Sequence, residues 1–284
     1  MMKIWILGGQ GFIGRALQLA CMRHGISWVA SSREEADITD ARRLIKIGDC
    51  IRPTHIINCA ALTKVDLVEK EPERAFAVNT IGAKYVAVAA LELGAQLLHL
   101  STETVFDGLQ DRPYKEEDPC RALCIYGQSK LGGEQWVREV MQEACILRTS
   151  WVFGLGSNHK LSQWIQRFAH EDVIHAPIDE IGSPTYVHDL AETILAMLDK
   201  SGTFHFANQG ELSLYHYARD LHQALRERNP QMRCREIKAV TSTHFSRRES
   251  RPSFGVLDTS YIGKILGKQP RSWKQVLEDF IKEL

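Results

Sequence analysis

Tyr126 and Lys130 have the side-chain types and the spacing of a proton-transfer pair. Residues four apart on a helix lie on one face, one turn apart. An ammonium beside a phenol favours the phenolate, so it lowers the pKa of the phenol from its ordinary value of about 10. A tyrosine tuned in this way donates a proton to a carbonyl oxygen, or accepts one, near neutral pH. The hydroxyl of Thr102 or Ser101 would hold the same oxygen, so we predict chemistry at a carbonyl group.

A glycine-rich turn supplies the second signal. Gly8, Gly11 and Gly14 directly follow an apolar stretch at residues 3–7 that is typical of a buried strand, and they open a predicted helix. Such glycines let the backbone approach a diphosphate, and the helix N-terminus offers free N–H groups to the phosphates. A Tyr-x-x-x-Lys spacing alone is common on exposed helices, so its pairing with this turn makes the prediction specific. We predict dinucleotide contacts from Gly8, Gln10, Gly11, Phe12, Ile13 and Gly14.

The end of the second predicted strand discriminates between the two nicotinamide cofactors. An acidic residue at this place would bond the ribose hydroxyls of NAD. The chain instead has Ser32 and Arg33, and a hydroxyl beside a guanidinium suits the 2′-phosphate of NADP. We therefore expect NADPH, and NADH stays open because Glu34 follows directly. Further contacts are expected near the adenine and along the cofactor backbone, from Asp37, Ile38, Cys59, Ala60 and Ala61.

Short β-branched stretches alternate with longer amphipathic stretches through the first 150 residues. This alternation predicts right-handed βαβ units, and hence a parallel sheet with helices on both faces. The expected fold class is therefore α/β, with a doubly wound Rossmann-type sheet. Strands are expected at residues 3–7, 26–30, 55–59, 96–101 and 145–148, and helices from the glycine turn to about 24 and at 40–51, 75–93 and 126–141.

The pattern loosens after Trp151, and the second half of the chain predicts a smaller α/β substrate lobe. We expect residues 1–150, together with about 182–205, to form the NADP(H)-binding domain, and residues 151–284 to form mainly the substrate-binding lobe. Ligands of doubly wound folds bind at the carboxyl ends of the strands, which would face this lobe. Helices are expected at 161–170, 187–198 and 213–228, a strand at 203–207, and a closing amphipathic helix from Trp273.

Composition narrows the class of protein further. The chain has 284 residues, 44% of them hydrophobic and 25% charged, which is typical of a globular fold. Lys plus Arg and Asp plus Glu both total 35, so the net charge gives no general attraction for nucleic acid or an anionic membrane. The seven cysteines form no CxxC motif, and the N-terminal apolar stretch is too short for a signal peptide. We expect a cytoplasmic protein with reduced thiols and neither nucleic-acid nor membrane partners.

Taken together, these motifs resemble the extended short-chain dehydrogenase/reductases, and more closely the dTDP-4-dehydrorhamnose reductase family. The resemblance covers nearly the whole chain. The Arg-Thr-Ser-Trp stretch at 148–151, Gly-x-Pro-Thr at 182–185 and R-P-x-x-x-x-L-D-T at 251–259 are specific to this branch. The matching segments are 8–14, 36–40, 57–79, 101–108, 126–134, 147–154, 181–191, 251–260 and the terminal helix.

The resemblance implies an oxidoreductase of carbohydrate biosynthesis. The implied reaction is NADPH-dependent reduction of the C4 ketone of a nucleotide sugar, dTDP-4-dehydro-6-deoxy-L-mannose, to dTDP-L-rhamnose. Thr102, Tyr126 and Lys130 would be the catalytic residues; Tyr126 would protonate the ketone, and Lys130 would also bond the nicotinamide ribose. The resemblance further implies cofactor contacts from Thr63, Asn79 and Arg148, and substrate contacts from Val65, Asp66, Thr102, Glu103, Thr104, Trp151 and Arg251.

Two residues depart from the family pattern and keep other functions open. Glu103 and Thr104 stand where the family usually has Asp and Tyr, both expected to touch the substrate. One alternative is therefore a reductase of another nucleotide-linked 4-keto sugar. Another is a non-catalytic role, because the regulatory subunit of methionine adenosyltransferase resembles this chain in fold and in Tyr-x-x-x-Lys. Family members are often homodimers and some use Mg²⁺ at the subunit contact, so both stay open; the sequence assigns no metal ligand.

Overall fold

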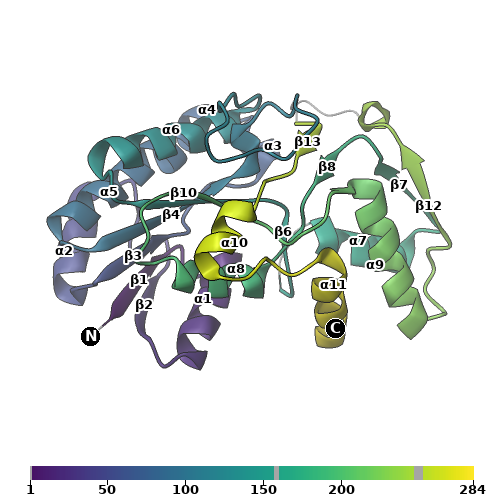
Figure 1. Cartoon of the computed structure of the whole chain (residues 1–284), viewed down its shortest axis with the longest axis horizontal. Coiled ribbons are helices and arrows are strands. Elements are labelled where there is room, and N and C mark those ends of the chain that lie inside the picture. Colours follow the sequence, from purple (N-terminus) through teal and green to yellow (C-terminus); the bar gives the residue numbers. More distant parts are fainter. Residues whose placement is uncertain (1, 157–159, 246–251) are drawn as a thin grey trace.

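Six parallel strands form the sheet of the first lobe in the computed structural model, at the left of Figure 1. The structure describes residues 2–156, 160–245 and 252–284. The strand order β10-β5-β4-β3-β1-β2 runs outward from β1 in both directions, so the predicted doubly wound fold class is confirmed. The strands are β1 Lys3–Leu7, β2 Ser27–Ser31, β3 His55–Asn58, β4 Gln96–Thr102, β5 Cys145–Thr149 and β10 Gly202–Phe206.

Helices cover both faces of this sheet, as the alternating pattern predicts. On one face α1 (Phe12–Arg23) packs beside α8 (Val187–Ala196), and on the other α5 (Ala83–Glu92) lies between α2 (Ala41–Ile51) and α6 (Ile125–Val140). Because both faces are buried, β3 and β5 are buried along their whole length. All five strands predicted in the first half form, with ends that differ from prediction by one residue at most.

The helix predicted at 75–93 is interrupted. It forms as α4 (Pro72–Phe76), a π-helical segment η1 (Ala77–Gly82) and α5. Helix α6 crosses η1 closely, because a Cβ on Gly133 would lie 2.3 Å from the carbonyl oxygen of Asn79. The π-helical turn therefore lies where α6 and η1 approach so closely that only a glycine fits at position 133, beside Asn79.

The second lobe, at the right of Figure 1, has its own core. Helices α7 (Lys160–His170), α9 (Leu214–Arg228) and α11 (Trp273–Glu283) enclose an aromatic cluster that includes Phe153 and Tyr217. Ser213 and Ser272 cap α9 and α11 through their hydroxyls. The smaller elements are α3 Val65–Val68, η2 Glu103–Val105, β6 Val152–Phe153, β7 Val173–Pro177, β8 Ile181–Gly182, β9 Thr185–Tyr186, β11 Leu212–Ser213, β12 Glu236–Val240, η3 Ser242–His244, β13 Phe254–Gly255 and α10 Ser260–Leu266.

One strand predicted in the second half belongs to the first lobe's sheet. Strand β10 pairs in parallel with β5 along its whole length. Helix α8, which precedes β10 in the chain, packs on α1. The chain thus passes from the first lobe to the second after β5 and returns before it ends in α11.

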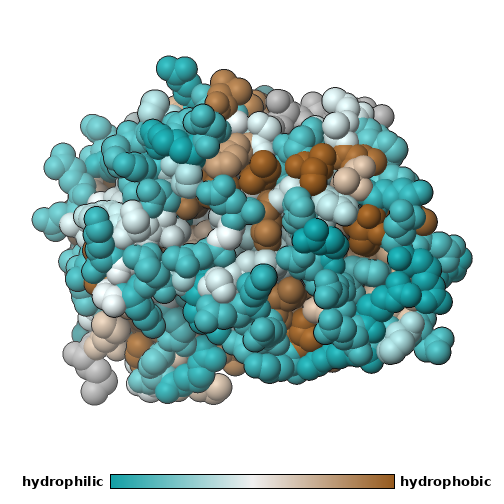
Figure 2. Space-filling model, turned by 45° about the vertical axis from the view of Figure 1, so that its right-hand side comes forward, coloured by the Kyte–Doolittle hydropathy of each residue, from teal (hydrophilic) through white to brown (hydrophobic). Residues whose placement is uncertain are grey.

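The surface is mostly hydrophilic in the view of Figure 2, with hydrophobic side chains gathered in patches near the middle of that face. Within the described ranges, no helix is both long enough and apolar enough to cross a membrane.

Candidate active site

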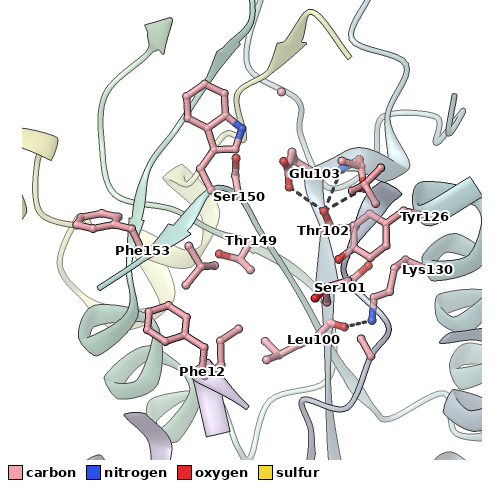
Figure 3. A pocket seen from close by; sticks show the side chains of 18 of the residues that line it. Phe12, Leu100, Ser101, Thr102, Glu103, Tyr126, Lys130, Thr149, Ser150 and Phe153 are labelled. Atoms are coloured by element: carbon pink, nitrogen blue, oxygen red, sulfur yellow. Dashed lines mark hydrogen bonds between the residues drawn. The ribbon is translucent and has the colours of Figure 1, made fainter. Parts of the chain in front are cut away.

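A cavity of about 420 Å³ lies between the two lobes, at the carboxyl ends of the central strands. Figure 3 shows its opposing walls, with Tyr126 and Lys130 on one side and Phe12 and Phe153 on the other. The cavity brings together residues predicted from separate segments. Those that line it are Gly8, Gly11, Phe12, Ile13, Gly14, Cys59, Ala61, Thr63, Val65, Thr102, Glu103, Thr104, Tyr126, Lys130 and Trp151.

The glycine turn fits the diphosphate of a dinucleotide. Gly8 has φ 77°, and a Cβ there would lie 2.8 Å from the backbone nitrogen of Ala60. A Cβ on Gly14 would lie 2.4 Å from the carbonyl oxygen of Gly8, so only glycine lets α1 begin this close to β1. Gly11 is the N-cap of α1 and makes no side-chain cap hydrogen bond, and the first residues of the helix, Phe12 to Gly14, line the cavity. Such a terminus attracts phosphate.

The residues predicted to select NADP lie beyond this cavity, at the end of β2. The backbone N–H of Ser32 donates to Glu35, and Arg33 Nε lies 3.3 Å from Asp37 Oδ2. The Arg33 side chain is 62% exposed, so its guanidinium is accessible to a ligand. Gly9 N donates to Ser31 O, which places the end of β2 beside the glycine turn. The roles of Ser32, Arg33, Asp37 and Ile38, together with Gln10 and Ala60, stay predictions.

Thr102 is the last residue of β4, and its hydroxyl lies between Glu103 and Thr104. Its Oγ1 donates to Glu103 Oε2 at 2.8 Å and accepts from the backbone N–H of Thr104 at 3.2 Å. Thr104 Oγ1 lies 3.1 Å from the same oxygen. Glu103 packs against Gly255, where a Cβ would lie 3.1 Å from the glutamate Cγ. The longer acid at position 103 therefore has room because a glycine from the second lobe faces it.

Tyr126 lies in the cavity wall on the first turns of α6, and its pKa is raised rather than lowered. Burial raises it most, the Glu103 carboxylate adds to this, and a hydrogen bond with Thr102 opposes both. The prediction that Lys130 lowers this pKa was wrong for the structure as it stands. The physical reason is that the Lys130 ammonium donates to the carbonyl oxygen of Leu100 at 2.6 Å instead of facing the phenol.

Lys130 is buried at the floor of the site. Burial lowers its pKa to about 8, against the opposing charges of Glu134 and Cys59. Its Nζ also lies 3.4 Å from Nε2 of His99, a buried histidine that no sequence motif marks. Among the lining residues that the structure describes, Lys130 is the one lysine or arginine, so positive charge in the cavity depends on it.

Two residues expected to contact the cofactor, Arg148 and Asn79, do not line the cavity and make hydrogen bonds to other parts of the protein. Arg148 is 1% exposed and donates from Nη2 to Glu134 Oε2 at 2.7 Å, so its guanidinium is turned into α6 and away from the ligand space. The side-chain amide of Asn79 accepts a hydrogen bond from the backbone N–H of Leu62 and donates to the Leu62 carbonyl oxygen and to Ser129 Oγ. Its amide thus positions the loop that carries Thr63. Neither residue lines the cavity, and the assignment of Arg148 and Asn79 as direct cofactor contacts stays a prediction.

Trp151 supplies an aromatic wall from the connection between the lobes. It has φ 40°, an uncommon value for a residue with a bulky side chain. Its ring packs over Gly182, where a Cβ would lie 2.5 Å from Trp151 Cε2. Val65 lines the cavity at the start of α3, whereas the side chain of Asp66 and all of Arg251 lie outside the described part of the structure.

Several lining residues were not predicted from the sequence. Those in the second lobe are Glu180, Ile181, Leu214, Tyr217, Pro252 and Gly255. Leu214 and Tyr217 are three apart in α9, so the apolar face of that helix was the one available signal. Among the described residues no group of three or more His, Cys, Asp or Glu side chains is arranged to hold a metal ion.

The doubly wound sheet, the glycine turn at its first helix and the Tyr-Lys pair facing one cavity define an oxidoreductase of the extended short-chain dehydrogenase/reductase class. A family model described as the RmlD substrate binding domain matches residues 2–284. The chain belongs to that family.

Named relatives agree with this membership. The spore coat polysaccharide biosynthesis protein SpsK of Bacillus subtilis is 32% identical over 100% of this chain and 98% of its own length. A dTDP-4-dehydrorhamnose reductase of Mycobacterium tuberculosis is 35% identical over 97% of this chain and 91% of its own. A crystal structure of the dTDP-4-dehydrorhamnose reductase of Bacillus anthracis in complex with NADP superimposes with a TM-score of 0.92 and 33% identity, covering 100% of both chains.

Proposed function

We propose that the protein is a dTDP-4-dehydrorhamnose reductase, which reduces the C4 ketone of dTDP-4-dehydro-6-deoxy-L-mannose to dTDP-L-rhamnose with NADPH. The observation that carries the proposal is that one cavity joins the glycine turn at Gly8–Gly14 to Thr102, Tyr126 and Lys130. Membership of the RmlD family supports the reaction and the substrate class.

The residues of the chain have distinct tasks in this reaction. Bound NADPH supplies the hydride. Tyr126 donates its hydroxyl proton to the C4 oxygen, and its raised pKa keeps that proton in place at neutral pH until it is needed. Thr102 orients the same oxygen through its hydroxyl. The glycine turn and the N-terminus of α1 bind the diphosphate, and Arg33 with Ser32 binds the 2′-phosphate.

The sugar would lie between the two lobes. We assign Trp151 to its ring, and Val65, Glu103 and Thr104 to its polar and apolar edges. Glu180, buried in the second lobe and lining the same cavity, is added to this set. Asp66 and Arg251 stay predicted substrate contacts. A homodimer is the proposed assembly, and no metal is assigned to the mechanism.

The test is oxidation of NADPH by the purified protein with dTDP-4-dehydro-6-deoxy-L-mannose made in situ, next to an NADH reaction. We expect NADPH oxidation with dTDP-L-rhamnose as product. Oxidation with a different nucleotide-linked 4-keto sugar only would move the proposal to that substrate. No oxidation with any keto sugar, together with capture of a methionine adenosyltransferase, would replace it by the regulatory-subunit function.

A further inference from the structure

His99 is a buried histidine with no task in the proposed reaction. It lies in β4, three residues before Thr102, and is 1% exposed. Its two ring nitrogens face two different side chains. Nδ1 lies 3.1 Å from Asn58 Nδ2 at the end of β3, and Nε2 lies 3.4 Å from Lys130 Nζ on α6. The histidine therefore bridges the sheet and the catalytic lysine.

The hydrogen bonds of Asn58 fix the proton on this imidazole. Asn58 Oδ1 accepts from the backbone N–H of Ala60 at 3.1 Å, so the amide nitrogen must be the atom that faces His99. An amide nitrogen only donates, so Nδ1 of His99 must accept. A neutral imidazole then carries its proton on Nε2, and that N–H points at Lys130. His99 is neutral because burial, with the charge of Arg138, holds its pKa well below the ordinary value.

The Nε2–H of His99 conflicts with an ammonium on Lys130. An ammonium has three donors and no acceptor, whereas a neutral amine has a lone pair that accepts this N–H. Moving the imidazole proton to Nδ1 does not help, because Nδ1–H would then face the Asn58 amide N–H at 3.1 Å. One donor–donor contact persists for as long as Lys130 is protonated. The hydrogen bonds from Asn58 through His99 to Lys130 are all satisfied only when Lys130 is a neutral amine that donates to Leu100 O and accepts from His99.

We propose that Asn58 and His99 stabilise the neutral amine of Lys130, so that this lysine is a titrating group of the site rather than a permanent cation. His99 is then a positioning residue that acts through Lys130. Burial acts in the same direction on the lysine pKa. The other groups that face Lys130 are Glu134 one turn along α6 and Cys59 at the end of β3, and both oppose it.

The inference deepens the proposed function and rests on it for its catalytic meaning. A Lys130 ammonium near Tyr126 would stabilise the phenolate, whereas the amine would not. Lys130 donates to Leu100 O in this structure, so proton donation by Tyr126 would depend on pH through His99 only when bound substrate and cofactor turn the lysine toward the phenol. The state of Lys130 itself is measurable without any substrate, so failure of the inference and failure of the proposed reaction give different results.

The first test uses the unaltered protein and NMR of labelled side chains. With ¹³Cε-labelled lysine, the Lys130 signal, assigned by its loss in Lys130→Met, should titrate near pH 8. A midpoint near the ordinary lysine value of about 10.4 would overturn the proposal. With ¹⁵N-labelled histidine, His99 at pH above that midpoint should show the Nε2–H form. The Nδ1–H form would overturn the proposal even if no variant folds.

The second test is His99→Asn. An asparagine side chain still offers an acceptor to Asn58 but is too short to place a donor at Lys130. The Lys130 midpoint should rise by about one pH unit, a tenfold change in its deprotonation equilibrium. The control is His205→Asn, because His205 is also a buried neutral histidine but bonds Tyr114 O and Arg148. An unchanged midpoint in folded His99→Asn, or an equal rise in His205→Asn, would reject the role of His99.

Discussion

Thr102 donates its hydroxyl proton to the carboxylate of Glu103 at 2.8 Å. A hydroxyl has one proton, so Thr102 cannot give that proton to Glu103 and to a ketone oxygen at once. Glu103 also adds to the raised pKa of Tyr126. Glu103, one of the two residues that depart from the usual family pattern, is thus coupled to two of the three proposed catalytic residues, and it can alter the proposed reaction without replacing either of them.

Glu103→Gln should move the alkaline limit of turnover to lower pH. The change removes a negative charge that raises the pKa of Tyr126, so the phenol loses its proton at lower pH and stops donating earlier. We expect a shift of about one pH unit or less, measured as the pH dependence of kcat. Glu180→Gln is the control, because Glu180 lines the same cavity but does not act on Tyr126. Equal shifts in both variants would argue against the coupling.

Tyr126→Phe should lower kcat by about 10²–10⁴ while NADPH still binds, because only the proton donor is lost. Binding is measured by NADPH fluorescence, and turnover by NADPH oxidation. Tyr114→Phe is the control, since the Tyr114 hydroxyl donates to Asp107 and does not line the cavity. Retained turnover in Tyr126→Phe would remove this residue from the mechanism.

Arg33→Ala should weaken NADPH much more than NADH. A charged hydrogen bond to the 2′-phosphate is worth about 1.5–3 kcal/mol, so the loss for NADPH should be about tenfold or more. The dissociation constants of both cofactors are compared with those of Arg42→Ala, an exposed arginine of α2. Equal losses for the two cofactors in Arg33→Ala would place the 2′-phosphate elsewhere.

The sequence was most informative where local rules decide the structure. The strands of the first lobe and the glycine turn at Gly8–Gly14 follow from periodicity and backbone approach. The cavity then brings Thr102, Tyr126 and Lys130 together, as their positions at the strand end and on one helix face predict. Each of these signals is contained in a short stretch of the chain.

The features of the site that could not be predicted from the sequence depend on contacts between segments that are separated along the chain. Arg148 and Glu134 are 14 residues apart, and only the packing of α6 on β5 shows that they pair. Lys130 turns to Leu100 and His99 because those atoms lie beneath it in the sheet, which helical spacing alone does not reveal. Four of the lining residues of the second lobe, Glu180, Ile181, Pro252 and Gly255, belong to two-residue strands and loops, where no periodic pattern exists to be read.

Arg148→Met should destabilise the protein by about 3–5 kcal/mol, because it leaves the Glu134 carboxylate buried without its main partner. Burial alone would raise the pKa of Glu134, but hydrogen bonding and charge from Arg148 lower it overall. A lowered pKa gives stability that is present above the unfolded value near 4.5 and is lost as pH falls below it. The double variant Glu134→Gln with Arg148→Met removes the unpaired charge, so thermal unfolding should show recovered stability and a weaker loss in acid. A single variant as stable as the unaltered protein would mean that this buried pair does not hold β5 to α6.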